Sequence, residues 1–411
     1  MKKNRATVHQ YLESIRYFFT TDFGIALAIV IVWQFVMSLF GYVIDITTSS
    51  ALSTGAPNLH EATGLLGHTY RWDSGWYNNV TNHFYNNSSQ PASTAFYPLF
   101  PILVVIVKML FLGHIGITTA AFLLNTVASW LAIVALIKII RSFTKNDSTR
   151  WLILGVFIAS PVAFFLHMIY GEAVFIAFGF WAYWFSLQKK WGPMAVMLAF
   201  VSASRLPALT FILLCGLQYI QSYKWNIIKA VKSWKWLWFL LSPLGLMLYG
   251  IYLYFVRGDF FAMVHAYQET DDWNYYHFTP NIFYTIGRSV KTLFDAYFSK
   301  SLDIGLLISH ALPLVALAIL LLASLYALFG MKKKGIPLGI FGLASFIMFT
   351  INGHLVSAHR YVLPCIVVYI ALAVLAEKYA IAKYLLYPVL FASMLIQSLL
   401  IVLFINHYFV G

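Results

Sequence analysis

The sequence predicts an all-α polytopic membrane protein, and three observations carry this prediction. The chain has 411 residues, of which 61% are hydrophobic and only 10% charged, whereas a water-soluble surface needs far more charge. Apolar runs of about 20 residues, which match the hydrocarbon thickness of a bilayer, recur along the whole chain. Lysines and arginines, which produce a net charge of +13, stand in short clusters between these runs. We therefore expect one membrane domain over 1–411, without a separate soluble domain and without a nucleic-acid partner.

The N-terminal segment predicts a retained membrane anchor. Lys2, Lys3 and Arg5 precede the first apolar run, which begins near Gly24 and has no small-residue cleavage pattern after it. Residues 8–20 are expected to form an interfacial helix on the inner leaflet. These features place the N-terminus in the cytoplasm and residues 46–115 outside, as a first extracytoplasmic loop with juxtamembrane helices.

The segment 96–112 decides the topology of everything that follows. It is apolar, but it is barely 17 residues long, contains Lys108 and carries Pro98 and Pro101 in its first turns. If it crossed the bilayer, the clusters around Arg141 and Lys189 and all later ones would lie outside, against the positive-inside rule. We expect a juxtamembrane helix that stays on the outer side.

The remaining apolar runs give about eleven spans in total, with the C-terminus outside. The expected spans are 24–45, 116–140, 151–169, 172–187, 192–204, 206–222, 236–256, 303–329, 336–352, 360–376 and 384–406. Several are shorter than a full crossing, notably those that meet at 170–172 and at 205–207. Because irregular backbone at membrane depth needs cover from protein or water, we expect a cavity in the outer half.

The cysteines and acidic residues predict no metal or other cofactor. Cys215 and Cys365 both lie in apolar runs without a Cys or His at metal-ligand spacing, and no disulfide framework is indicated. The first outer loop has too few carboxylates for a divalent cation, which needs several oxygen ligands.

The loop around Asp73 is the strongest candidate for chemistry. Asp73 stands among aromatic residues in the sequence 70–77, where partial desolvation would make its carboxylate a better proton acceptor. The alternative is a purely structural one, with Asp73 as the N-cap of a short helix.

Three further charged residues are expected on the same side of the membrane. Arg205 and Arg360 suit a lipid phosphate through bidentate hydrogen bonds, and snorkelling to headgroups is the alternative. His359 adds a polar group beside Arg360. Glu172 is either a second acid or the partner of an arginine, since an ionisable group at this depth needs one.

Motifs along the chain resemble the PIG-V-type mannosyltransferases of the GT-C glycosyltransferase superfamily, in a bacterial form. The motifs are 71–77 with 83–85 and 95–101, then 160–175, 202–207, 257–273 and 357–363, in the family's order. The resemblance implies a GT-C-like bundle that takes a mannose-like hexose from a polyprenyl-phosphate-sugar donor. It implies that Asp73 is the catalytic base and that transfer inverts the anomeric centre.

The same resemblance, with the positions of the side chains, gives the expected site. Substrate-binding residues are expected to be Arg71, Trp72, Trp76, Tyr77, Glu172, Arg205, His359 and Arg360. Arg205 and Arg360 are assigned to the leaving phosphate by inference from their charge. The acceptor would be an envelope glycan, a glycolipid or a protein, and the sequence leaves open which of these and which sugar.

Alternative locations and functions remain open at this point. Sequons at Asn79 and Asn87 would place glycans inside the active loop, which favours a bacterial plasma membrane over an endoplasmic reticulum. A transporter or lipid flippase would also bury charges in a polytopic bundle, but it predicts inverted repeats and charges near the midplane. A third possibility is a non-catalytic scaffold that keeps the fold.

Overall fold

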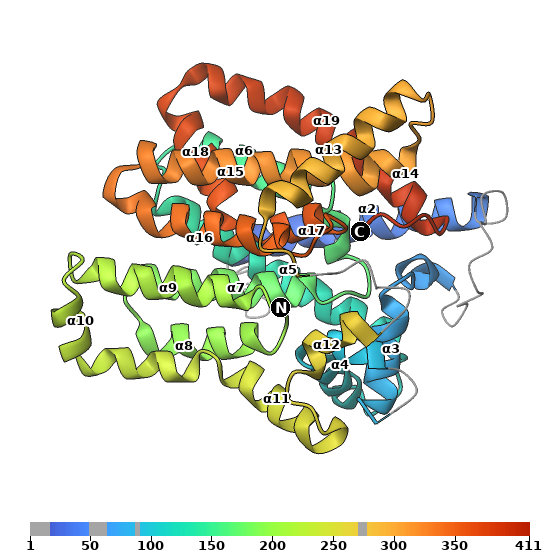
Figure 1. The fold of residues 1–411 in the computed structure, drawn as a ribbon, viewed down its shortest axis with the longest axis horizontal. Helices are drawn as coiled ribbons and strands as arrows, with labels where there is room; N and C mark the ends of the chain where they lie inside the picture. The colour runs from blue at the N-terminus through green and yellow to red at the C-terminus, as the bar shows by residue number, and fades with distance from the viewer. Residues whose placement is uncertain (1–16, 49–63, 87–90, 270–277) are drawn as a thin grey trace, which may run out of the picture.

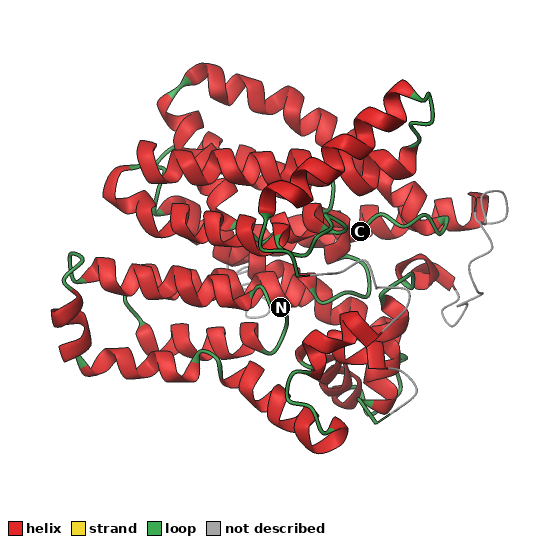
Figure 2. Cartoon of the chain, in the orientation of Figure 1, coloured by secondary structure: helices red, strands yellow, loops and turns green. Residues whose placement is uncertain are grey.

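The computed structural model describes residues 17–48, 64–86, 91–269 and 278–411. Within these ranges the chain forms helices and loops and no strand (Figure 2). The helices are α2 (Asp22–Thr48), α3 (Ser74–His83), α4 (Leu99–Leu110), α5 (Ile117–Arg141), α6 (Asp147–Ile158), α7 (Glu172–Leu187), α8 (Trp191–Ser202), α9 (Ala208–Ser222), α10 (Ile227–Lys232), α11 (Leu244–Arg257), α12 (Ala262–Glu269), α13 (Ile282–Phe298), α14 (Ile304–Leu306), α15 (Leu312–Gly330), α16 (Lys332–Thr350), α17 (Ala358–Val362), α18 (Ile366–Lys378) and α19 (Ala380–Ile405). Shorter 3-10 or π segments are η1 (Gly64–Thr69), η2 (Pro91–Ala95), η3 (Ala163–Leu166), η4 (Trp234–Leu241) and η6 (Leu307–Ala311).

Some expectations fall outside these ranges. The basic residues Lys2, Lys3 and Arg5, most of the interfacial helix expected over 8–20, and the sequon at Asn87 lie outside the described residues.

Among the described residues, four helices are long and apolar enough to cross a bilayer. They are α2, α5, the continuous helix Ile304–Gly330 and α19, and a fifth crossing results if η4 and α11, bent by 40°, count as one span. The apolar helices α7, α8 and α9 are shorter. The 16 residues of α7 extend about 24 Å at 1.5 Å per residue, less than the roughly 30 Å hydrocarbon core. The structure is thus that of a helical membrane protein, and about eleven spans are more than these helices establish.

Three expected spans are not continuous helices, and prolines explain each break. The span expected over 151–169 ends at Ile158, just before Ser160 and Pro161. The span expected over 360–376 is divided into α17 and α18 around Pro364, and that over 236–256 is bent next to Pro243. Proline removes a backbone donor and restricts the residue before it, which ends or bends a helix.

Helices α4 and α13 do not belong to the expected spans. The short helix expected within 96–112 is present as α4, whose 12 residues extend only about 18 Å. In Figure 1 it lies with α3 and α12 at the lower right. Helix α13 corresponds to no predicted element, because the charged residues Arg288, Lys291 and Asp295 interrupt its apolar residues.

The bundle has two chemically distinct ends. At one end, where α5, α7 and α9 terminate, Arg141 donates to Asp22 over 2.6 Å and Gln221 donates to the Lys333 carbonyl. We call this the basic end, because basic residues end, follow or begin helices there: Arg141, Lys145, Lys189, Lys190, Lys224 and Lys332 to Lys334. At the opposite end, Asn406 donates to Thr48 over 2.8 Å, and α7 begins at Glu172. Figure 1 shows the basic end at the left, with α10, and the opposite end toward α3 at the right.

Candidate active site

The loop that carries Asp73 is held in an unusual backbone conformation. Trp72, directly before Asp73, has a φ of 53°, in the left-handed region that a bulky residue rarely adopts. The hydroxyl of Tyr170 fixes this loop, because it accepts from the Asp73 amide over 3.1 Å and donates to the Arg71 carbonyl over 3.3 Å. Strained backbone that the surroundings enforce is typical of functional sites.

The side chain of Asp73 does not cap a helix. Asp73 occupies the N-cap position of α3, but its carboxylate accepts no hydrogen bond from the first turn. Oδ2 instead accepts from Arg360 Nη1 over 3.1 Å, across 287 residues of sequence. The helix-cap alternative therefore does not explain why an aspartate stands here.

Arg360 connects both carboxylates of this region. Its Nη1 also donates to the Gly411 main-chain oxygen over 2.9 Å, and its Nε lies 3.1 Å from Glu172 Oε1. The guanidinium is buried, and its centre lies 5.1 Å from the ring centroid of Phe165 and 5.3 Å from that of Tyr170. Stacking on aromatic faces and forked donors are the properties that distinguish arginine from lysine.

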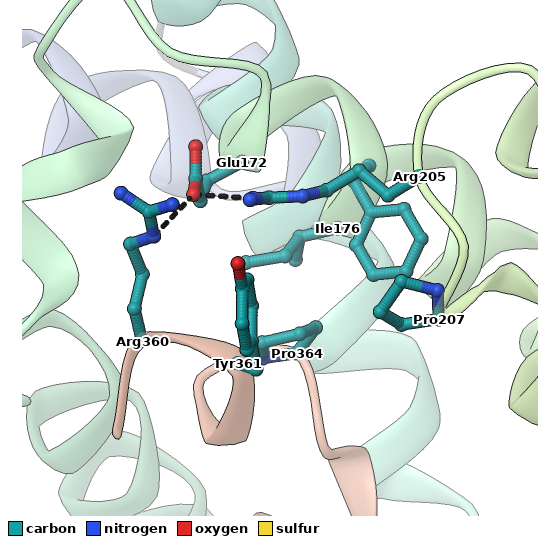
Figure 3. A pocket seen from close by; sticks show the side chains of 8 residues that line it. Glu172, Ile176, Arg205, Pro207, Arg360, Tyr361 and Pro364 are labelled. Atoms are coloured by element: carbon teal, nitrogen blue, oxygen red, sulfur yellow. Dashed lines mark hydrogen bonds and ion pairs between the residues drawn. The ribbon is translucent and has the colours of Figure 1, made fainter. Parts of the chain in front are cut away.

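Glu172 is the shared partner of two arginines. It is the first residue of α7, where the helix dipole favours a negative charge, and it is almost fully buried. Its Oε1 accepts from Arg205 Nη1 and faces Arg360, as Figure 3 shows. Its Oε2 is buried and has no hydrogen-bond partner among the described residues. Arg205 also lies 5.1 Å from the ring centroid of Tyr361.

These contacts unite four residues in one charged network: Asp73, Glu172, Arg205 and Arg360. Two carboxylates balance two guanidinium groups, which is what burial of charge requires. The sequence predicts all four on one side of the membrane, and the structure brings them into contact.

The free space beside the network is small. A cavity of about 10 Å³ is lined by Glu172, Phe175, Ile176, Arg205, Pro207, Arg360, Tyr361 and Pro364. This is close to the space that one water molecule needs. A cavity does lie where the short helices meet at 170–172 and 205–207, but packed side chains leave it far smaller than the hollow we expect from the sequence.

Burial and charge act in opposite directions on the pKa of Asp73. The side chain keeps 23% of its surface exposed, and this partial removal from water raises the pKa above the ordinary value of an aspartate, with a further increase from nearby Glu172. The positive charges of Arg360 and Arg205 lower it, but burial is the larger effect. Asp73 is therefore a stronger proton acceptor, when ionised, than an exposed aspartate.

The aromatic residues expected at the site pack against other aromatic rings and do not line the small cavity. Trp76 stacks on Phe96 with ring centroids 5.8 Å apart, and Tyr77 packs edge-on against Phe100 at 4.9 Å. Trp72 packs edge-on against Phe409, and its buried Nε1 has no hydrogen-bond partner in the described part of the chain. These ring contacts hold the segment 72–77 against neighbouring parts of the chain.

Arg71 and His359 point to structural partners. Arg71 Nη2 contacts Asp45 over 2.5 Å, and its Nε donates to the Ile405 carbonyl over 3.0 Å, so it joins α2 to α19. His359 Nε2 donates to the Val410 carbonyl over 2.7 Å. The geometry thus gives no support to our expectation that these two side chains bind substrate, since their donors face the protein.

Sequence reasoning missed several residues that position the site. Tyr170 and Tyr361 contact its charged groups, although both stand in the motifs quoted above. A buried pair, His68 and His167, joins Nε2 to Nε2 over 2.9 Å, and His167 Nδ1 contacts Gln34 of α2. This chain of contacts ties the segment before Asp73 to the first span. No sequence pattern reveals it, because the two histidines are 99 residues apart.

Within the described residues, no group of three or more His, Cys, Asp or Glu side chains is placed to hold a metal ion. A scan against protein-family models finds no match to this chain, and a search of curated proteins finds no similar sequence.

Proposed function

We propose that the protein is a membrane glycosyltransferase with Asp73 as its general base. It would move a hexose from a polyprenyl-phosphate-sugar to a hydroxyl of an envelope glycan, glycolipid or protein. The single observation that carries this proposal is the contact of Asp73 with Arg360 within a buried network that also holds Arg205. A desolvated carboxylate next to phosphate-binding groups is what such a transfer needs.

The proposed reaction is a single displacement. The acceptor oxygen attacks the anomeric carbon while its proton passes to the Asp73 carboxylate. The bond between the anomeric carbon and the phosphate oxygen breaks with inversion, and its electron pair leaves on the polyprenyl phosphate. Arg205 and Arg360 stabilise the phosphate as its negative charge increases. Trp72, Trp76 and Tyr77 would form the wall against which the sugar lies.

The described conformation is then a resting state. Each guanidinium is paired with a protein carboxylate, and the adjacent cavity of about 10 Å³ is far smaller than a hexose. A donor phosphate would replace Asp73 as the partner of Arg360 and leave the aspartate free to accept a proton. Entry of the donor requires the turns that carry Arg205 and Arg360 to separate.

We propose that the basic end faces the cytoplasm of a bacterial cell and the charged network faces outward. The lysine clusters between α7 and α8, after α9 and at the start of α16 support this orientation through the positive-inside rule. In this topology the N-terminus is cytoplasmic and α4 stays outside. The four long helices and the bent pair of η4 and α11 give five crossings, and the six that complete the eleven are α6, α7, α8, α9, α16 and α17 with α18. The fold would be a member of the GT-C superfamily of the PIG-V type, in line with the motif resemblance.

The experiment that tests this function follows sugar loss from a defined donor. Purified full-length protein receives polyprenyl-phosphate-mannose or polyprenyl-phosphate-glucose with a mixture of envelope acceptors. Sugar transfer by the native chain supports the proposal. If the protein instead moves the donor lipid between the leaflets of a liposome and leaves its sugar attached, the protein is a transporter and the glycosyltransferase proposal is wrong.

A further inference from the structure

A second polar hollow lies at the basic end of the bundle, far from the charged network. It has a volume of about 350 Å³ and is lined by Ser142, Phe143, Leu187, Gln188, Gln218, Gln221 and Lys334. These residues come from the ends of α5, α7 and α9 and from the first turn of α16. The 16 residues of α7 separate the hollow from Glu172 by about 24 Å.

The hollow combines one positive charge with unengaged amides. Gln221 donates to the Lys333 carbonyl and so joins α9 to α16 at its rim. Gln218 is half-buried and Gln188 exposed, and no protein group in the described chain accepts or donates a hydrogen bond to their side chains. Each amide offers both a donor and an acceptor. Lys334 adds three donors with a positive charge, and Phe143 and Leu187 add an apolar wall.

We propose that this hollow binds the headgroup of an anionic phospholipid whose phosphodiester carries free hydroxyls, as in phosphatidylglycerol. Lys334 contacts the phosphate. Gln188 and Gln218 exchange hydrogen bonds with the headgroup hydroxyls. The same hydroxyls can donate to main-chain carbonyls at the C-terminal ends of α5, α7 and α9, which have no partner within their helices. Basic pockets between membrane helices at the cytoplasmic surface bind such headgroups.

The position of the hollow favours a lipid over a soluble phosphate compound. Ser142 directly follows α5, which is long and apolar enough to cross the bilayer, so the hollow lies at the level where headgroups begin. Phe143 and Leu187, which pack against the hydrophobic core, give the hollow an apolar wall at this level. The proposal rests on the proposed cytoplasmic orientation of the basic end. It does not depend on glycosyl transfer, because none of these residues contacts the charged network.

The test is native mass spectrometry of the full chain in detergent, titrated with phosphatidylglycerol, phosphatidylserine or phosphatidylcholine. We expect phosphatidylglycerol to be retained most tightly. Gln218→Leu, which keeps volume and charge, should weaken this binding about three- to ten-fold through a lost hydrogen bond. Lys334→Ala should weaken it about five-fold more than the matched control Lys333→Ala, whose side chain does not line the hollow.

Three results would overturn the site. Equal retention of phosphatidylglycerol and phosphatidylserine, with equal losses in both lysine variants, would mean diffuse attraction to the basic end. Unchanged binding in Gln218→Leu would remove the amides from recognition. Displacement of the lipid by equimolar glycerophosphoglycerol or inorganic phosphate would assign the hollow to a soluble ligand instead.

Discussion

Replacement of Glu172 by glutamine tests whether this carboxylate is the counter-charge of both arginines. Its Oε1 contacts Arg205 and lies 3.1 Å from Arg360 Nε, and the carboxylate is buried. Unit charges 4 Å apart attract by about 4 kcal/mol at an effective dielectric constant of 20, so two such pairs amount to about 8 kcal/mol. Glutamine does not carry the cost of several kcal/mol for burying a carboxylate, and this gain offsets part of the lost attraction. The free energy of unfolding should therefore fall by about 3 to 5 kcal/mol.

The assay is unfolding by a denaturing detergent in mixed micelles, with Glu377→Gln as the matched control. Glu377 is exposed at the basic end, where its carboxylate accepts from the Lys145 amide over 3.2 Å. Its replacement should cost no more than about 1 kcal/mol. The double variant Glu172→Gln with Arg205→Gln restores charge balance and should recover part of the loss. A loss in Glu172→Gln as small as in the control, or no recovery in the double variant, would refute the network as described.

Three further predictions concern the base, Arg71 and the topology. If Asp73 accepts the proton, kcat/KM should rise with pH across a limb above the ordinary range of an aspartate, because burial raises its pKa and only the ionised form is active. Replacing Arg205 by Gln removes a positive charge and should move this limb to higher pH, whereas a limb that stays in place would exclude this coupling. Arg71→Gln should destabilise the protein by about 3 to 5 kcal/mol through its contact with Asp45, yet leave the KM for donor unchanged; a higher KM at unchanged stability would restore a substrate-binding role. Reporter fusions after residues 145 and 333 should both report a cytoplasmic location, and finding either outside would overturn the placement of 96–112.

The sequence predicts the class of this fold well and its continuity poorly. Apolar composition indicates a helical membrane protein, because hydrophobic content sums over the whole chain and does not depend on packing. The helix breaks at Ser160 to Pro161 and at Pro364 could have been predicted from proline alone. The apolar residues on both sides of each proline instead predict one continuous span. Helix α13 escapes notice because Arg288, Lys291 and Asp295 interrupt its apolar residues, so it has no apolar run long enough to predict a span.

The candidate site shows the same division. The cost of burying an ionisable group in the bilayer and the expected topology together predict that four residues lie on one side of the membrane: Asp73, Glu172, Arg205 and Arg360. Which carboxylate pairs with which guanidinium depends on how α3, α7 and α17 pack, and no local pattern encodes contacts between residues 287 positions apart. Arg71 illustrates the limit most clearly. Arg71 lies two residues before Asp73, which suggests a shared role. Because the backbone turns tightly at Trp72, the Arg71 side chain contacts the Ile405 carbonyl, whereas that of Asp73 contacts Arg360.

The most direct test of the account compares sugar transfer by the native protein, Asp73→Asn and the control Asp259→Asn. The asparagine side chain keeps the shape of the aspartate and can still accept from Arg360, so the variant removes mainly the base. Asp259 is a half-exposed aspartate whose carboxylate contacts His265, outside the charged network. We predict that Asp73→Asn lowers kcat about 10²- to 10⁴-fold, while Asp259→Asn stays within a few-fold of the native rate. A native rate in Asp73→Asn would contradict the assignment of Asp73 as the base.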